Sequence, residues 1–286
     1  MNWIIMPVVN NWLWTKQAIK DCLAQSIETR ILVVYNGADP SFRIQLEGWA
    51  EEEPRLLCWF HSPALPSLAA TWNTALDFVW EAGGAAALVV NNDVRLHRQT
   101  YERLLSGMAA TKALFITAVG VTQDQFEIFG KEYPEILHNE PGIPERGGPD
   151  FSCFLISKAC HRAGRFDEGF VPAYCEDLDY HRRLMLGGHA DKIFSINLPF
   201  LHYASGTIKE YTAEEKQAFE QRIGQSRRHY EVKWGGPVNQ ERFRSPFGEN
   251  DPAFNKVTGY PSGTPVTTPE LQAYFRRLDA QPSEAD

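Results

Sequence analysis

Short apolar runs of strand length alternate with amphipathic segments through the first 110 residues. The runs are residues 3–9 (WIIMPVV), 31–35 (ILVVY), 56–60 (LLCWF) and 86–90 (AALVV). Between them, apolar residues recur at helical spacing, as in residues 18–23 and 68–79. Strand alternating with helix predicts an α/β fold, in which a mainly parallel, Rossmann-like sheet carries helices on both faces.

The fourth run ends on polar side chains in the stretch AALVVNNDVRL, residues 86–96. Ligands bind beyond the carboxyl ends of the strands in sheets of this kind. This rule predicts one cleft, formed by residues 7–11, 35–37 and 91–93. Asp93 offers the oxygen ligands that divalent cations prefer, so it is expected to mark the reactive centre. The alternative is that the Asn and Asp residues only end a strand in a turn.

The second half of the chain contains further strand-like runs and a predicted helix that begins with acidic residues. Strand-like runs follow at residues 113–121, 152–159 and 192–198. Residues 122–150 are loop-rich and are expected to form a substrate-facing insertion. Glu176, Asp177 and Asp179 precede or open a predicted helix that stops at Gly187, and the helix dipole favours ionised carboxylates there.

Six motifs follow one another in the order PVVN, VVYNG, AATWNTA, VNNDV, GRFDEGF and CEDLDYHRR. This order resembles the family-two glycosyltransferases of the GT-A fold. The resemblance implies an inverting enzyme that moves a hexose from a nucleotide-sugar donor, expected to be a UDP-sugar, to an acceptor hydroxyl with the help of Mn²⁺ or Mg²⁺. It covers residues 1–208, with a nucleotide-sugar half of about residues 1–110 and an acceptor half of about residues 111–208. Residues 209–286 are then a C-terminal helix and an extended tail.

Carried over residue by residue, the resemblance assigns Asp93 to a divalent cation on the donor diphosphate, with Asn91 and His202 as further ligands. Asp177 matches the base that takes the proton of the acceptor hydroxyl, and Glu176 is the next candidate. The alternatives are structural. Acidic residues commonly complement a helix dipole, and a single histidine is more often a hydrogen-bonding residue than a ligand.

The donor nucleotide is expected to contact Pro7, Val9, Asn10, Tyr35, Asn36, Asn73 and Asn92. One position departs from the family pattern, because relatives often carry an aspartate after the second strand that reads the nucleobase, and Tyr35 stands there. Tyr35 would stack on a base, or Asn36 would hydrogen-bond to it. The alternatives are that Tyr35 is a core residue and that Asn73 lies at the edge of an amphipathic helix.

The acceptor side is expected to include Asp150, Arg182, Lys233 and Trp234. Residues 229–248 are similar to the tails of phage-encoded members of the family, some of which modify hydroxymethylated DNA bases or virion proteins. Basic and aromatic side chains in this segment would bind a polyanion through charge and stacking. A glycan, a protein and modified DNA therefore stay open as acceptors. The alternative is that this helix and arm pack back over the transferase core.

Charge and composition restrict the partners. A formal net charge of −8 disfavours non-specific capture of nucleic acid by the chain as a whole. The five cysteines lack CxxC spacing, which signals neither a zinc site nor a disulfide framework and fits a reducing cytoplasm. No run approaches the roughly 20 apolar residues of a membrane span and no basic leader is present, so no membrane insertion is expected. The oligomeric state is left open.

Two other functions fit parts of the pattern. A nucleotidyltransferase of related fold would carry a Gly-rich, basic phosphate loop after the first strand, and PVVNNWLWTK is not Gly-rich. A non-catalytic nucleotide-sugar-binding protein would keep the donor intact, whereas many transferases slowly hydrolyse it.

Overall fold

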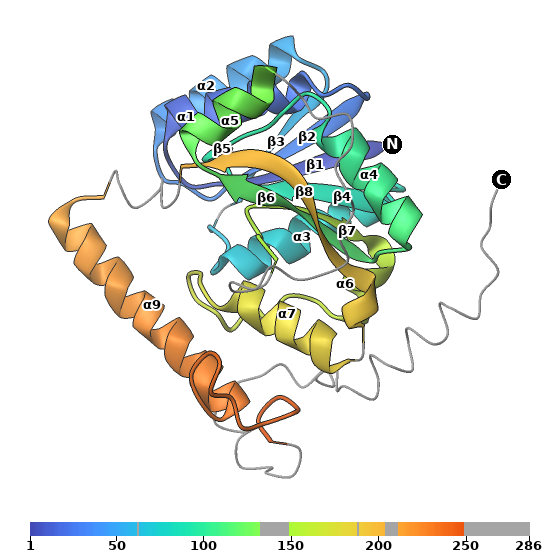
Figure 1. The fold of residues 1–286 in the computed structure, drawn as a ribbon. Helices are drawn as coiled ribbons and strands as arrows, with labels where there is room; N and C mark the ends of the chain where they lie inside the picture. The colour runs from blue at the N-terminus through green and yellow to red at the C-terminus, as the bar shows by residue number, and fades with distance from the viewer. Residues whose placement is uncertain (62, 132–148, 188, 204–210, 249–286) are drawn as a thin grey trace.

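The computed structural model describes residues 1–61, 63–131, 149–187, 189–203 and 211–248. They form a sheet with helices packed on both faces (Figure 1). The strands are β1 (Asn2–Val8), β2 (Thr29–Tyr35), β3 (Leu56–Phe60), β4 (Ala86–Val90), β5 (Val94–Arg95), β6 (Phe115–Val121), β7 (Cys153–Ser157) and β8 (Ile193–His202). The helices are α1 (Trp12–Leu23), α2 (Pro40–Glu52), α3 (Leu68–Glu81), α4 (Thr100–Thr111), α5 (Gln123–Lys131), α6 (Lys158–Ala163), α7 (Glu176–Leu186), the short 3₁₀ helix η1 (Ala190–Lys192) and α9 (Ala213–Trp234).

The strand order is β3-β2-β1-β4-β7-β6-β8-β5. β3, β2, β1 and β4 are parallel to one another, and β6 is parallel to β8. β7 runs antiparallel to both β4 and β6, and β5 runs antiparallel to β8. The predicted α/β class with a mainly parallel sheet is therefore confirmed. The antiparallel direction of β7 was not predicted, since the composition of residues 152–159 indicates a strand but not its direction.

Side chains along β1 alternate between two hydrophobic cores, as the pleat of a strand requires. Ile4 and Met6 pack with residues of α1, α2 and α4. Trp3 and Ile5 pack with residues of α3, α6 and α7 on the other face. Because both faces are covered, the carboxyl edge of the parallel strands is the part of the sheet left for a ligand.

α9 packs against α7 and the loop before it (Figure 1). Its buried residues are Ile223, Ser226, Tyr230, Lys233 and Trp234. The Lys233 Nζ lies 2.7 Å from Asp167 Oδ2 and 2.7 Å from Asp179 Oδ1. The Trp234 indole N–H donates to Asp179 Oδ1 at 3.0 Å. A fully buried ammonium is tolerated here because two carboxylates compensate its charge.

Further contacts attach α9 to residues 167–171. His229 Nε2 lies 3.0 Å from Asp167 Oδ2, and Ser226 Oγ donates to the Val171 carbonyl at 3.1 Å. Burial alone would raise the pKa of Asp167, but Lys233 and His229 outweigh it and hold that pKa well below its usual range. The helix expected from about residue 209 thus begins at Ala213, and the buried face of its second half anchors it to α7 and residues 167–171. Residues 249–286 lie outside the described residues.

The remaining expectations concern the insertion, the thiols and the membrane. α5 occupies the start of the loop-rich stretch 122–150, and residues 132–148 lie outside the described residues. All five cysteines are free thiols. Within the described ranges, every helix is too short or too polar to cross a bilayer.

The Lys233 contacts give a stability prediction. Lys233→Met removes the charge between Asp167 and Asp179 and leaves both carboxylates buried together, so the free energy of unfolding should fall by about 3–5 kcal/mol. Urea denaturation measures this change. The matched control is Lys216→Met, on an exposed turn of the same helix, which should change the free energy by no more than about 0.5 kcal/mol. Equal effects of the two substitutions would contradict the role given to Lys233.

Candidate active site

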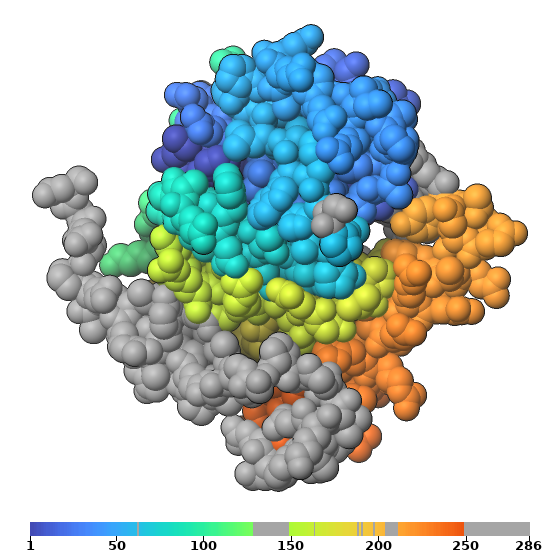
Figure 2. Space-filling model, turned by 180° about the vertical axis from the view of Figure 1, so that it is seen from behind, coloured from blue at the N-terminus to red at the C-terminus, as the bar shows by residue number. Residues whose placement is uncertain are grey.

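A cavity of about 860 Å³ opens at the carboxyl ends of β1, β2 and β4. Residues 172–177, at the start of α7, and side chains of α9 close it on another side, and α9 projects from the core in Figure 2. The predicted site residues that line it are Pro7, Val9, Asn36, Asn91, Asn92, Asp93, Asp150, Glu176, Asp177 and His202. Those outside its lining are Asn10, Tyr35, Asn73, Arg182, Lys233 and Trp234.

Asp93 and His202 meet because the ends of two distant segments pair. Val94 of β5 stands opposite His202 at the end of β8, and the Tyr203 N–H donates to the Asp93 carbonyl at 2.9 Å. Asp93 Oδ1 consequently lies 3.3 Å from His202 Nε2. His202 Nδ1 lies 3.2 Å from Ser152 Oγ. The structure thus places two of the three predicted cation ligands side by side.

The donor set of this pair suits a divalent cation. A carboxylate oxygen with an imidazole nitrogen fits Mn²⁺ better than Mg²⁺, which prefers oxygen ligands throughout. No cluster of three or more His, Cys, Asp or Glu side chains able to hold a metal occurs in the described part of the chain. A cation bound at Asp93 and His202 would therefore take its other ligands from amide oxygens, water and the oxygens of a bound substrate.

The asparagines next to Asp93 shape the cavity wall. The Asn91 N–H donates to the Ser152 carbonyl at 3.0 Å. The Asn92 side-chain amide donates to the Asn10 carbonyl at 2.8 Å and to Thr15 Oγ1 at 2.9 Å. Asn92 therefore fixes the loop between β1 and α1 along the cavity, while Asn10 contributes a backbone carbonyl to this network.

The start of α7 brings two carboxyl groups into the cavity wall. Cys175 is the N-cap residue in a left-handed conformation with φ of 70°, and Glu176 and Asp177 follow it. Glu176 is 4% exposed and Asp177 is half-buried. Asp177 Oδ1 accepts the Leu178 N–H at 2.8 Å.

Burial raises the pKa of both carboxyl groups. At Asp177 burial is the largest effect, the backbone N–H of Leu178 opposes it, and the charges of Asp150 and Asp179 add to it. At Glu176 burial is again the largest effect, followed by repulsion from Asp177. The expectation that these groups ionise more easily is corrected, because burial raises the pKa of both.

Asp150 is held beside this pair by its own turn. Its Oδ1 accepts the Ser152 N–H at 2.9 Å. Gly120 of β6 leaves room for it, since a Cβ there would lie 2.8 Å from Asp150 Oδ2. The cavity therefore contains, besides Asp93, Glu176 and Asp177, a fourth carboxyl group whose charge acts on Asp177.

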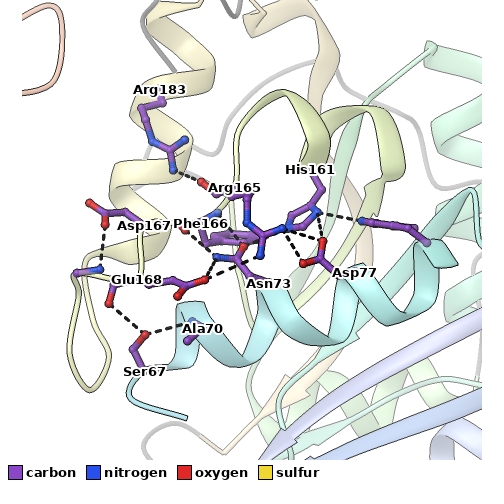
Figure 3. Close-up of polar contacts among 12 residues, drawn as sticks. Ser67, Ala70, Asn73, Asp77, His161, Arg165, Phe166, Asp167, Glu168 and Arg183 are labelled. Atoms are coloured by element: carbon purple, nitrogen blue, oxygen red, sulfur yellow. Dashed lines mark hydrogen bonds and ion pairs between the residues drawn. The ribbon is translucent and has the colours of Figure 1, made fainter. Parts of the chain in front are cut away.

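Asn73 lies in a hydrogen-bond network outside the cavity lining (Figure 3). Its amide nitrogen donates to the Phe166 carbonyl at 2.9 Å and to Glu168 Oε1 at 2.8 Å. Its oxygen accepts the Phe166 N–H at 3.0 Å and lies 3.0 Å from His161 Nε2. Because both amide atoms are fully used, the structure corrects the expected nucleotide contact. Asn73 instead holds the FDE triad, residues 166–168, against α3.

His161 completes this network in its neutral form. Burial is the main reason that its pKa is lowered to about 4. Its Nδ1 accepts the Trp80 indole N–H at 2.9 Å, which leaves the Nε2 proton for Asn73 Oδ1. His161 thereby adds two hydrogen bonds between neutral groups to the network that joins the triad to α3.

Tyr35 and Asn36 have separate roles. The Tyr35 ring stacks on Phe42 with centroids 4.9 Å apart, and its hydroxyl bonds the backbone of Asp39, so the alternative of a core residue describes it. Its expected stacking on a base is corrected accordingly. Asn36 does line the cavity, where its Nδ2 donates to Thr71 Oγ1 at 2.6 Å and its Oδ1 accepts the Leu65 N–H at 3.3 Å.

Three residues expected on the acceptor side are used inside the protein. Lys233 and Trp234 are fully buried at Asp167 and Asp179. Arg182 lies over the Trp234 ring, 4.9 Å from its centroid. Its guanidinium also donates to the Phe243 carbonyl at 2.9 Å. The structure corrects their assignment to an acceptor, because packing of the C-terminal segment onto α7 occupies them.

Sequence reasoning missed the cavity residues Tyr174, Tyr211, Phe219 and Arg222. The loop before α7 carries Tyr174 to the cavity, Tyr211 lies just before α9, and α9 carries Phe219 and Arg222. The available signal was the helical spacing of Phe219, Ile223 and Tyr230 in an otherwise polar segment, which indicates that one face of this helix is packed.

Solved structures share this fold. The mannosyltransferase PcManGT from Pyrobaculum calidifontis, in complex with GDP-Man and Mn²⁺, is similar with a TM-score of 0.54 and 14% identity, over 99% of this chain and 76% of that chain. S. aureus TarS is similar with a TM-score of 0.52 and 14% identity, over 80% of this chain and 43% of that chain. The TarS fragment 1–349 in complex with UDP-GlcNAc is similar with a TM-score of 0.52 and 13% identity, over 80% of this chain and 72% of that chain.

These likenesses establish a common fold. The alignment with the longer TarS chain spans less than half of that protein's length. No protein-family description and no curated protein sequence matches this chain.

The carboxyl cluster gives a titration prediction. Asp150→Asn removes a like charge that raises the pKa of Asp177, so Asp177 should titrate at lower pH in the variant. Carbon-detected NMR of the Asp177 carboxyl measures the shift. A raised pKa in the folded state means that the free energy of unfolding falls as pH rises from the ordinary value of about 3.9 to the raised one, and the variant should lose less stability across that window. Asp124→Asn, exposed on α5, is the control, and an unchanged Asp177 titration in Asp150→Asn would contradict the coupling.

Proposed function

We propose that this protein is a metal-dependent inverting glycosyltransferase of the GT-A type, which transfers a hexose from a UDP-sugar to an acceptor hydroxyl. The observation that carries the proposal is the joint placement of the Asp93–His202 pair and Asp177 around one cavity at the carboxyl edge of the sheet. The fold shared with a mannosyltransferase that binds GDP-Man and Mn²⁺ supports it.

Asp93 and His202 would hold the cation. A divalent ion bound there supplies positive charge to the diphosphate that leaves with the nucleotide. Mn²⁺ is the better candidate because one ligand is an imidazole nitrogen. Ser152 orients His202 through the contact at Nδ1, as partners of metal-bound histidines do.

The donor nucleotide would lie along Pro7, Val9 and Asn36. Asn36 already donates one amide hydrogen to Thr71 and accepts one from Leu65. A carboxamide has two donors and two acceptor sites, so one of each is left for the edge of a nucleobase. This is how Asn36 would recognise a uracil in place of the aspartate of relatives.

Asp177 would act as the base in a single displacement. The acceptor oxygen attacks the anomeric carbon, the bond from that carbon to the diphosphate oxygen breaks, and the acceptor proton passes to Asp177. Attack from the face opposite the leaving group inverts the anomeric centre. The raised pKa of Asp177 makes its ionised form a stronger base than an exposed aspartate.

The cation assignment predicts a loss of metal-linked donor binding. Asp93→Asn keeps the shape of the side chain and removes its charge, so the gain in UDP affinity on adding Mn²⁺ should shrink by at least about 10-fold. Calorimetric titration of UDP with and without Mn²⁺ measures it, and a chelator should reproduce the effect in the unsubstituted protein. Asp124→Asn serves as the control. A variant that retains the full Mn²⁺ effect would show that the cation binds elsewhere.

The base assignment predicts a separation of binding from turnover. Asp177→Asn should keep UDP affinity within about twofold and lower the rate of UDP release from the best UDP-sugar, in the presence of acceptor, by about 10²-fold or more. Glu176→Gln is the comparison and should lower the rate less. Equal losses of affinity and rate in Asp177→Asn would indicate a structural role. A protein that binds the donor but never releases UDP would be a non-catalytic binder. Release of pyrophosphate from UTP and a sugar 1-phosphate, supplied in a separate assay, would indicate a nucleotidyltransferase.

A further inference from the structure

The side of the cavity near the proposed base is formed by three aromatic rings and an arginine. The ring centroids of Tyr174 and Phe219 lie 5.9 Å apart, and those of Tyr211 and Phe219 lie 5.5 Å apart. Arg222 stands one helical turn beyond Phe219 on α9 and also lines the cavity. We call Tyr174, Tyr211, Phe219 and Arg222 the aromatic–arginine wall.

The backbone places Tyr174 in this wall at a conformational cost. Tyr174 and Cys175 both adopt left-handed conformations, with φ of 76° and 70°. Bulky side chains rarely occupy this region, and such residues concentrate at sites where ligands bind. Tyr174 is 39% exposed. Asp177 follows three residues later and lines the same cavity.

Arg222 is the single Lys or Arg among the described residues of the cavity lining. The carboxyl groups there belong to Asp93, Asp150, Glu176 and Asp177. In the described part of the chain, no carboxylate forms an ion pair with Arg222, and its charge reaches Tyr211, where it lowers a pKa that burial and Glu215 raise. A guanidinium so placed is available to an anionic group of a ligand.

The other basic residues of α9 do not form a continuous basic surface with Arg222. At about 100° per residue, Lys216, Arg227 and Arg228 point about 120°, 140° and 240° around the helix from Arg222. Lys233 is buried between two carboxylates. A nucleic acid binds best to a continuous row of positive charge, whereas this cavity offers one cation beside aromatic rings that pack edge to face.

We propose that the aromatic–arginine wall is the acceptor subsite and that it selects an anionic sugar, whose ring packs on the aromatic side chains while its phosphate or carboxylate pairs with Arg222. The inference rests on the proposed transferase function and names the substrate class of the same cavity. A sugar ring presents C–H groups to the negative face of an aromatic ring, and the arginine fork matches the oxygens of either anion. The charge of the acceptor would thereby orient its hydroxyl toward Asp177.

The test compares matched sugars on the protein saturated with UDP and Mn²⁺. Glucose 6-phosphate and glucuronate are the anionic probes, glucose is the neutral probe, and calorimetry measures their affinities. Both anions should bind at least about 10-fold more tightly than glucose, the range of a charge-assisted pair. Arg222→Gln should remove this difference and leave UDP affinity and melting temperature unchanged. Arg228→Gln, exposed on the same helix, should leave the difference intact, and Phe219→Ala should weaken all three sugars alike.

The outcomes separate the subsite from the function. Equal affinities for the anions and glucose, or a preference that survives Arg222→Gln, would overturn the subsite while UDP binding upholds the transferase. A fall in UDP affinity in Arg222→Gln would assign the arginine to the donor diphosphate and overturn the proposal. Tighter binding of a single-stranded oligonucleotide that is lost in Arg222→Gln would make the wall a nucleic-acid site. Absence of any UDP binding with Mn²⁺ would overturn the proposed function and the subsite together.

Discussion

The buried ammonium of Lys233 is the constraint on which the second half of the molecule depends. Two carboxylates, Asp167 and Asp179, share it, and each comes from a different segment of the chain. A charge cannot stay in such a place unless both partners keep their positions. α9, the loop before α7 and α7 itself are therefore fixed relative to one another, and Asp177 is fixed with them, since it precedes Asp179 on the same helix.

The cation pair depends on a different feature, the antiparallel pairing of the short strand β5 with the end of β8. β7 is antiparallel to β4 and β6, and β6 is parallel to β8. The sheet can then return β8 to the carboxyl end of β4, where β5 pairs with it. His202 consequently arrives next to Asp93. A sheet with every strand parallel would also bring strand ends to one edge, but the direct backbone pairing beside Asp93 needs the antiparallel β5.

The sequence predicts those features that depend on neighbouring residues. The apolar runs predict β1 to β4 and place Asp93 at the end of a strand, and the acidic residues before a helical pattern place Asp177 at the start of a helix. Asn73 and Lys233 could not be placed in this way. Each is a polar residue whose partners, such as Phe166 and Asp167, lie far away in the sequence. The resemblance assigns Asn73 to the nucleotide, whereas its amide nitrogen and oxygen both form hydrogen bonds within the protein. The direction of β7 likewise depends on its pairing with β4 and β6, which the composition of the segment does not reveal.

The two halves of α9 have different roles. One face of its second half, from Ile223 to Trp234, is buried and holds the fold, whereas its first half presents Phe219 and Arg222 to the cavity and is otherwise exposed. If the proposed acceptor subsite is right, substitutions in the first half would alter the choice of ligand at little cost in stability. Residues 213–222 would then be replaceable as one block, in evolution or by engineering, while residues 223–234 keep the helix attached to the rest of the protein.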